Sequence, residues 1–210
     1  RFCFADNVAL AYSDKVDIKW TTSGTPDSCT ASVDWSGGKV AGGGTETQGP
    51  LTGKVQYIYT IGCVKNGLTV SDTAVVNVVP SVWCAPNPAF GRAPLSLSWG
   101  ATASPSVSYT YSWTGTDGLT GSGAAVSKNY TTGGTKSATV TATAPVPNTV
   151  LGPSVSGTYT CSAPIQDPLP DLTATAPPFT SGLIPTGRTN EYYADTTLTL
   201  RAVPLDPLNV

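Results

Sequence analysis

Two cysteines, Cys29 and Cys63, each lie within a run of residues that reads as a β-strand, and this pair constrains the fold more than any other feature of the chain. Around them apolar and polar residues alternate, from Lys15 to Trp20 and again from Val55 to Cys63. Alternation at period two is typical of strands with one buried face. Cysteines in such strands, each close to an aromatic residue, predict a small β-sandwich whose sheets are joined through the core by a disulfide.

The composition favours an all-β chain. Charged residues make up only 11% of the 210 residues, whereas Gly and Pro number 22 and 18. The length allows two domains of about 80 residues and a tail. A net charge of −2 offers no basic surface for nucleic acid, and no apolar run reaches the ~18 residues of a membrane-spanning helix. We therefore expect no nucleic-acid partner and no membrane insertion.

The chain has no Met and no His, and it has five Cys. Without Met it cannot begin at its own initiator, so we expect Arg1 to follow a removed secretion signal. Without His it lacks the commonest general base and metal ligand. Cysteines that form no Cys-x-x-Cys pair in a small β-rich chain favour structural disulfides and an extracellular or cell-surface location.

Residues 1–80 read as a first sandwich with an apolar leader. Asn66-Gly67 stands between two strand-like runs and predicts a type I′ hairpin, whose second strand is expected to point Ala74, Val76 and Val78 inward. Several motifs occur in a familiar order: Ser28-Cys29-Thr30-Ala31-Ser32, Trp35-Ser36-Gly37, Gly49-Pro50-Leu51-Thr52 and Tyr57 to Cys63. This order resembles the bacterial immunoglobulin-like repeats of secreted and surface-anchored proteins. The resemblance covers most of residues 10–80 and implies a stalk or spacer without catalytic residues.

Residues 81–165 read as a second sandwich. The segment Tyr109-Thr110-Tyr111-Ser112-Trp113, together with Gly134 to Thr141, is similar to PKD domains, another family of extracellular sandwiches. PKD domains generally carry Asp or Asn-Gly signals after the last strand but one. Ala144-Pro145-Val146-Pro147-Asn148 stands there instead, so we expect an unusual final hairpin.

Residues 166–210 read as a Pro-rich linker followed by two strand-like runs, 170–176 and 194–203. These runs resemble the first two strands of a third sandwich, of the cell-adhesion-related (CARDB-like) type found in bacterial surface proteins. The tail is too short to close such a fold alone, because an isolated strand pair is marginal in water. We expect it to be either a truncated domain or a donor of strands to another molecule.

One disulfide per sandwich predicts the pairs Cys29–Cys63 and Cys84–Cys161. The second pair joins the first and last strands of its sandwich, so tension along the chain would pass through the bond and bypass the domain. Cys3 is left over. It is either a partly buried thiol in the leader or the site of a bond to another subunit.

No catalytic or metal site is predicted. The nearest carboxylate pairs fit solvated turns, no Asp-x-Asp run suggests calcium, and Gly42-Gly43-Gly44 lacks the Lys and the helix of a phosphate loop. Asn129-Tyr130-Thr131 matches the N-glycosylation sequon. Core packing is favoured over stacking on sugars for four tryptophans, Trp35, Trp83, Trp99 and Trp113. We expect no enzyme activity and no cofactor.

The whole pattern favours a structural subunit of an extracellular filament, pilus or cell-surface stalk that assembles head-to-tail with copies of itself. Exposed strand edges recruit other chains, and the leader and tail hold strands with no domain of their own, so we expect strand exchange between subunits. The residues expected at that contact are Phe2, Cys3, Phe4, Leu198, Leu200 and Val203. The alternative is a non-catalytic spacer or adhesin module of a larger surface protein, whose partner is a cell-surface polysaccharide or a host protein.

Overall fold

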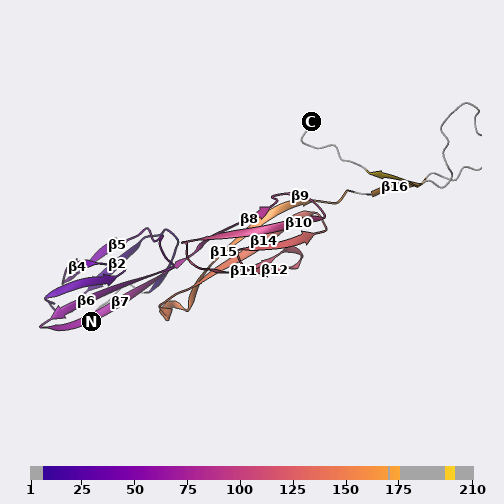
Figure 1. The fold of residues 1–210 in the computed structure, drawn as a ribbon. Helices are drawn as coiled ribbons and strands as arrows, with labels where there is room; N and C mark the ends of the chain where they lie inside the picture. The colour runs from indigo at the N-terminus through magenta and orange to yellow at the C-terminus, as the bar shows by residue number, and fades with distance from the viewer. Residues whose placement is uncertain (1–6, 170, 176–196, 202–210) are drawn as a thin grey trace, which may run out of the picture.

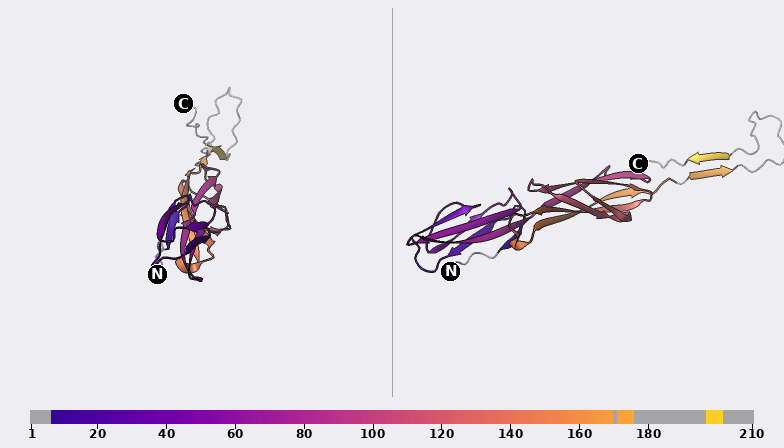
Figure 2. Two further views of the ribbon diagram at one scale, coloured as in Figure 1. Left: turned by 90° about the vertical axis from the view of Figure 1, so that its left-hand side faces the viewer. Right: turned by 60° about the horizontal axis from the view of Figure 1, so that its bottom comes forward.

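The structure is a computed structural model that describes residues 7–169, 171–175 and 197–201. Two β-sandwiches follow one another end to end, and a two-stranded sheet comes after them in the chain (Figures 1 and 2). The described residues contain no α-helix, only two short 3-10 turns. The prediction of an all-β chain of tandem immunoglobulin-like sandwiches with strand-forming extensions is confirmed. The domain boundaries 80/81 and 165/166 remain a prediction.

The first sandwich packs a five-stranded sheet, in the order β1-β7-β6-β3-β4, against the pair β2-β5. Its strands are β1 (Val8–Ala11), β2 (Val16–Thr21), β3 (Ser28–Val33), β4 (Gly37–Lys39), β5 (Gly43–Gln48), β6 (Gln56–Lys65) and β7 (Leu68–Val79). Alternation works as predicted: in β2, Ile18 and Trp20 are buried while Asp17 and Lys19 are exposed. The core lies between β2 and the inner face of β3, β6 and β7.

The turn between β6 and β7 follows the Asn-Gly signal. Asn66 and Gly67 both have positive φ, 50° and 77°, which a type I′ turn requires at its two central residues. The hairpin pairs β6 with β7 from Lys65↔Leu68 to Gln56↔Asn77. Ala74, Val76 and Val78 are buried, as predicted.

The second sandwich packs a three-stranded sheet, β13-β10-β8, against a five-stranded sheet, β12-β11-β14-β15-β9. Its elements are β8 (Ser81–Asn87), β9 (Gly91–Arg92), β10 (Leu95–Ser104), β11 (Thr110–Gly115), η1 (Thr116–Gly118), β12 (Leu119–Ser122), β13 (Ala125–Tyr130), β14 (Gly134–Pro145), η2 (Thr149–Leu151) and β15 (Ser154–Gln166). Trp99 and Trp113 fill the core, and their indole N–H groups donate to the Tyr130 hydroxyl at 3.2 Å and the Gly123 carbonyl at 2.9 Å.

Both predicted disulfides are present, but only one of them joins two sheets. Cys84 on β8 and Cys161 on β15 belong to opposite sheets of the second sandwich. Cys29 and Cys63 instead lie directly opposite each other on β3 and β6 of one sheet, with 4.1 Å between their Cα atoms. The predicted link across the first core is therefore wrong, because neighbouring antiparallel strands bring facing Cβ atoms within reach of a disulfide without crossing the core.

The chain ends pair differently from the strand exchange that the sequence suggested. β1, in the leader, adds to β7 as a parallel strand, and Val8 and Leu10 pack against the first core. In the tail, β16 (Asp171–Thr175) pairs with β17 (Thr197–Arg201) as an antiparallel sheet of two strands. For the described part of the leader, residues 7–12, the expectation that nothing local covers it is thus wrong, and the described tail strands pair with each other. Both pairings have the same physical reason: an open sheet edge and a nearby strand satisfy each other's backbone hydrogen-bonding groups.

Candidate functional site

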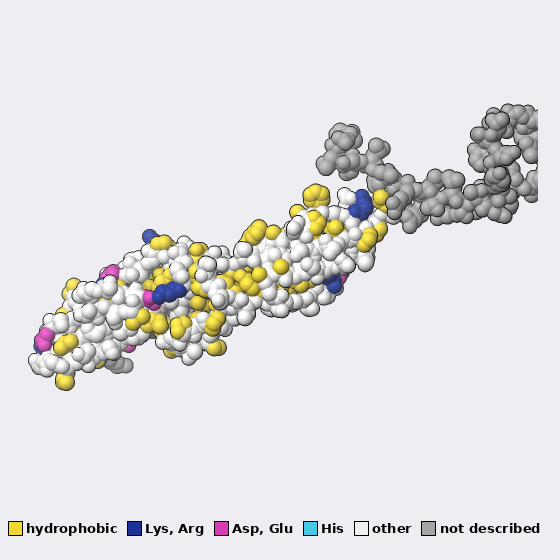
Figure 3. All heavy atoms as spheres, in the orientation of Figure 1, with side chains coloured by type: hydrophobic (Ala, Val, Ile, Leu, Met, Phe, Trp, Pro, Cys, Tyr) yellow, Lys and Arg dark blue, Asp and Glu magenta, His cyan; other side chains and the backbone are white. Residues whose placement is uncertain are grey.

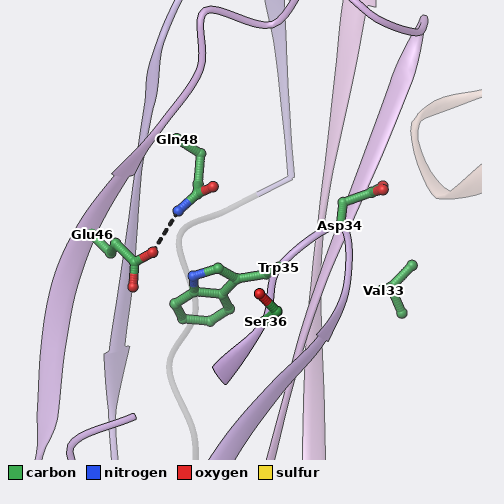
Figure 4. Close-up of a pocket in the computed structure, with 6 residues that line it drawn as sticks. All are labelled: Val33, Asp34, Trp35, Ser36, Glu46 and Gln48. Atoms are coloured by element: carbon green, nitrogen blue, oxygen red, sulfur yellow. Dashed lines mark hydrogen bonds between the residues drawn. The ribbon is translucent and has the colours of Figure 1, made fainter. Parts of the chain in front are cut away.

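A shallow polar hollow of about 300 Å³ lies at the end of β3 in the first sandwich. Figure 4 shows Trp35 at its centre, between Asp34 and Ser36 on one side and Glu46 and Gln48 of β5 on the other. Val33 has a φ of 71° and is exposed. Since positive φ is an outlier for a β-branched residue, the chain leaves strand geometry here, and Trp35 turns inward to pack edge-to-face on Trp20 at 5.2 Å between ring centroids.

Each of the two carboxylates that line this hollow, Asp34 and Glu46, is paired with a lysine. Lys39 Nζ lies 2.5 Å from Glu46 Oε2 and 4.3 Å from the centre of the Trp35 ring. The Lys39 ammonium, and then the Trp35 indole N–H, lower the pKa of Glu46. Gln48 Nε2 donates to Glu46 Oε1 at 2.7 Å. The Trp35 indole N–H is buried without a hydrogen-bond partner, although it lies near enough to Glu46 to favour the charged carboxylate.

The arrangement in the hollow supports the end of strand β3. Asp34 pairs with Lys54 and accepts a 2.8 Å hydrogen bond from the Ile58 backbone N–H, so it ties the chain after β3 to β6. The Trp35 side chain is buried, with Lys39 over its ring and Trp20 packed edge-to-face against it. Among the described residues no three His, Cys, Asp or Glu side chains gather as a metal site would need. The same residues include no helix with the length and apolarity to cross a membrane.

The junction between the two sandwiches consists of a one-residue link and of close contacts between the two domains. β7 ends at Val79 and β8 begins at Ser81, so Pro80 alone connects the domains. Figure 1 shows β7 leading directly into the second sandwich. β15 passes close to this link: a Cβ added at Gly157 would stand 2.2 Å from the Pro80 carbonyl oxygen. Only glycine therefore fits at this position of β15.

A buried polar network crosses the junction. Gln56 and Asn77, on adjacent strands of the first sandwich, are 4% and 2% exposed. Gln56 Nε2 donates to Asn77 Oδ1 at 2.8 Å and to the backbone carbonyl of Asn148 at 2.7 Å. The Asn148 backbone N–H donates back to Gln56 Oε1 at 2.8 Å. The side-chain amide thus pairs with the turn that follows β14 as a neighbouring strand would. In the part of the chain that the structure describes, no buried side-chain amide is left without a hydrogen bond.

Apolar contacts surround this network. Val55, which precedes β6, is buried in one cluster with Ala144, Val146 and Val155 of the second sandwich. Tyr109 packs against the same cluster, and burial first, then Tyr111 and Tyr12, raise the pKa of Tyr109 to about 12. The segment 144–148 is the one that departs from the PKD pattern. In this chain it forms the second sandwich's half of the junction.

The other residues singled out by the sequence do not come together. Asn129 is exposed on β13, an edge strand, so its side chain is accessible, and its glycosylation remains a prediction. Leu198 and Leu200 lie on β17, opposite Ala174 and Leu172. Phe2, Cys3, Phe4 and Val203 lie outside the described residues. Nothing in the described part of the chain therefore tests the proposed contact between subunits.

Sequence reasoning misplaced one tryptophan and missed two amides. Trp35, Trp99 and Trp113 are buried as predicted, but Trp83 is 56% exposed. Its strand neighbours Val82 and Cys84 face inward. Because a disulfide across the core requires Cys84 to face inward, the predicted bond already implied that Trp83 faces outward. Gln56 and Asn77 are both buried, and the sequence gives no signal for their network, because the backbone of the second domain completes it.

Comparison with known proteins does not place the chain in a family. No protein-family model matches it, and no curated protein matches it. Solved structures that resemble it include one described as the structural basis for Dscam isoform specificity, with 13% identity over 80% of this chain and a TM-score of 0.45. Domains 3–5 of the extracellular part of Drosophila OTK share 12% identity over 80% of this chain, with a TM-score of 0.45. A complex of Dpr2 Ig1-Ig2 with DIP-Theta Ig1-Ig3 shows 12% identity over 83% of this chain, with a TM-score of 0.41.

These resemblances are too distant to carry conclusions about function. The chain covers 45%, 62% and 69% of those three structures.

Proposed function

We propose that this chain is a non-catalytic structural module of an extracellular surface, which holds two points a fixed distance apart. The observation that carries the proposal is the junction, where Pro80 is the whole linker and Gln56 binds the backbone of Asn148. Domains in one chain usually move relative to each other unless their interface is extensive. Here a one-residue link, a buried polar network and an apolar cluster all oppose bending, which is the property a spacer needs.

The second disulfide supports a role under tension. Cys84 lies on the first strand and Cys161 on the last strand of the second sandwich. A force that enters through the junction and leaves toward the tail passes through this covalent bond, so the sandwich between them does not need to resist it. The bond also favours an oxidising, extracytoplasmic setting.

Pulling the chain by residues 7 and 169 in a single-molecule force experiment tests this role. Under oxidising conditions the residues between Cys84 and Cys161 should contribute no extension. Reduction should release the 34 residues closed by Cys29–Cys63, about 120 Å, and the 77 residues closed by Cys84–Cys161, a gain of about 270 Å of contour length. The Cys29→Ala/Cys63→Ala variant, which keeps the second bond, should still show this reduction-dependent gain. Equal extension of oxidised and reduced protein would contradict the proposal.

A second candidate is the subunit of an extracellular filament that assembles head-to-tail through the tail. The observation in its favour is the sheet β16-β17, which has no third strand within the described residues. Two strands alone are marginal in water, so a partner strand from another copy would stabilise them. Because β1 belongs to its own sandwich, this candidate uses only the tail.

Removal of residues 170–210 tests the filament candidate without disturbing either sandwich. If the tail assembles subunits, the intact chain should form polymers visible by negative-stain electron microscopy, and the shortened chain should remain monomeric at the same concentration. A monomeric intact chain, or polymers of the shortened one, would exclude assembly through the tail and leave the spacer role untouched.

A further inference from the structure

The outer face of sheet β13-β10-β8 carries one large aromatic side chain in a strand position where it contributes nothing to the core. Trp83 is 56% exposed, whereas Val82 and Cys84 on either side of it are buried. Its position in the middle of β8 means that the backbone beneath it is fixed by the sheet and by the Cys84–Cys161 bond. A tryptophan that faces water from a rigid strand keeps a broad, flat apolar surface ready at little entropic cost.

The neighbours of Trp83 on this face are too small to cover the indole ring. Thr102 lies directly opposite it on β10, and the next outward pair along the strands is Ala85 and Gly100. A Cβ built on Gly100 would meet no atom within 4 Å. Beyond Gly100, β13 presents Ala125. The indole ring of Trp83 therefore lies next to an open surface of small side chains on β10 and β13.

This outer face is uncharged. By strand alternation its outward residues are hydroxyl, amide or small side chains around the one tryptophan: Ser81, Trp83, Ala85, Asn87, Ser96, Ser98, Gly100, Thr102, Ser104, Ala125, Ser127 and Asn129. The cation of β13, Lys128, faces the other side of its strand, opposite Leu97. Figure 3 shows how few charged side chains the second sandwich carries in that view.

We propose that this face binds a neutral polysaccharide, with the C–H face of a pyranose ring stacked on Trp83. The chemistry of the face selects this ligand. Nucleic acid and acidic polymers require cations, which the face lacks. A protein partner normally docks around several apolar anchors, and this face has a single one. Sugar hydroxyls are both donors and acceptors, and they match the Ser, Thr and Asn side chains on either side of the ring.

The test is affinity electrophoresis of the whole chain in gels that contain one polysaccharide each: laminarin, xyloglucan, mannan or dextran as neutral probes and alginate as an anionic probe. We expect at least one neutral probe to retard the protein and alginate not to do so. Trp83→Ala should weaken the binding at least tenfold. Phe90→Ala removes another exposed aromatic, 74% exposed in the loop before β9, and should leave the binding unchanged.

Two results would overturn the proposal. One is an intact chain that no neutral probe retards, or a Trp83→Ala variant, shown to be folded by its circular dichroism, that binds as tightly as the parent. The other is concentration-dependent association of the intact chain in sedimentation that Trp83→Ala abolishes, which would assign the face to a second copy of the chain. Neither result bears on the spacer role, because Trp83 lies outside the junction.

Discussion

The side-chain amide of Gln56 makes two hydrogen bonds to the backbone of Asn148, which lies 92 residues later in the chain and in the other sandwich. An amide that bonds both the N–H and the C=O of one residue imitates the pairing of neighbouring strands. In this protein it joins two domains that have almost no linker. The relative orientation of the sandwiches is therefore set by buried contacts.

Replacing Gln56 with Ala should loosen the junction. The change removes three hydrogen bonds and leaves Asn77 and the Asn148 peptide group without partners, at a cost of about 1–3 kcal/mol for each buried unsatisfied group. In ¹⁵N relaxation we expect the two sandwiches to share one rotational correlation time in the parent and to show separate, shorter times in Gln56→Ala. Gln48→Ala, the same change away from the junction, should preserve the common time. A common time in Gln56→Ala would mean that the apolar cluster suffices.

Replacing Gly157 with Ala should destabilise the same region by contact with the linker. The new Cβ would stand 2.2 Å from the Pro80 oxygen and 3.0 Å from Val82 Cγ2, so β15 or the link must move. We expect a loss of about 1–3 kcal/mol in the free energy of unfolding, which is typical of overpacking. Gly100→Ala is the matched control, since that glycine lies in a strand of the same sandwich with open space around it. Equal effects of the two changes in urea denaturation would refute the close approach.

Removing the disulfides should destabilise the protein in the order of the loops they close. By the loss of chain entropy in the unfolded state, the Cys84–Cys161 bond, with a separation of 77, contributes about 4.5 kcal/mol, and the Cys29–Cys63 bond, with a separation of 34, about 3.8 kcal/mol. Double Cys→Ala variants compared by thermal unfolding should therefore both melt at lower temperature than the parent. A variant that unfolds like the parent would show that its bond adds no stability.

Alkaline pH should destabilise the first sandwich through Tyr59. Burial, and then the nearby Asp34 carboxylate, raise the pKa of Tyr59 to about 12 from 10.0. The folded state thus holds the phenolic proton more tightly than the unfolded state. The contribution of this proton, up to about 3 kcal/mol, is complete below pH 10 and is lost as the pH rises toward 12. Tyr59→Phe should lose less stability than the parent between pH 9 and pH 11.5 in urea titrations, and an identical loss would contradict this account.

Local sequence patterns predicted the two sandwiches but not the contacts that join one domain to the other. The Asn66-Gly67 turn and the alternation around Ile18 follow from short-range chemistry. The partners of the four paired cysteines follow from one disulfide in each predicted sandwich, and the structure has all of these as expected. The sequence does not predict that Cys29 and Cys63 lie in the same sheet. A disulfide between neighbouring strands of one sheet and a disulfide across the core both join two strand-like runs. Spacing in the sequence cannot separate these two geometries.

The functional surfaces depend on contacts that lie far apart in the sequence. Gln56 sits at a position that reads as solvent-facing, and only the second sandwich buries it. Trp83 looks like a core residue by composition, and only the phase set by Cys84 turns it outward. Such departures from local expectation concentrate where a chain makes contacts beyond its own fold.

Residual dipolar couplings of the intact chain, measured separately for residues 8–79 and 81–166, test the rigid junction most directly. If Gln56, Asn148 and the Val55 cluster fix the two sandwiches as one body, both sets of couplings will fit a single alignment tensor in the orientation of the structure. Two tensors of different magnitude would show that the sandwiches move independently, and the spacer account would then be wrong.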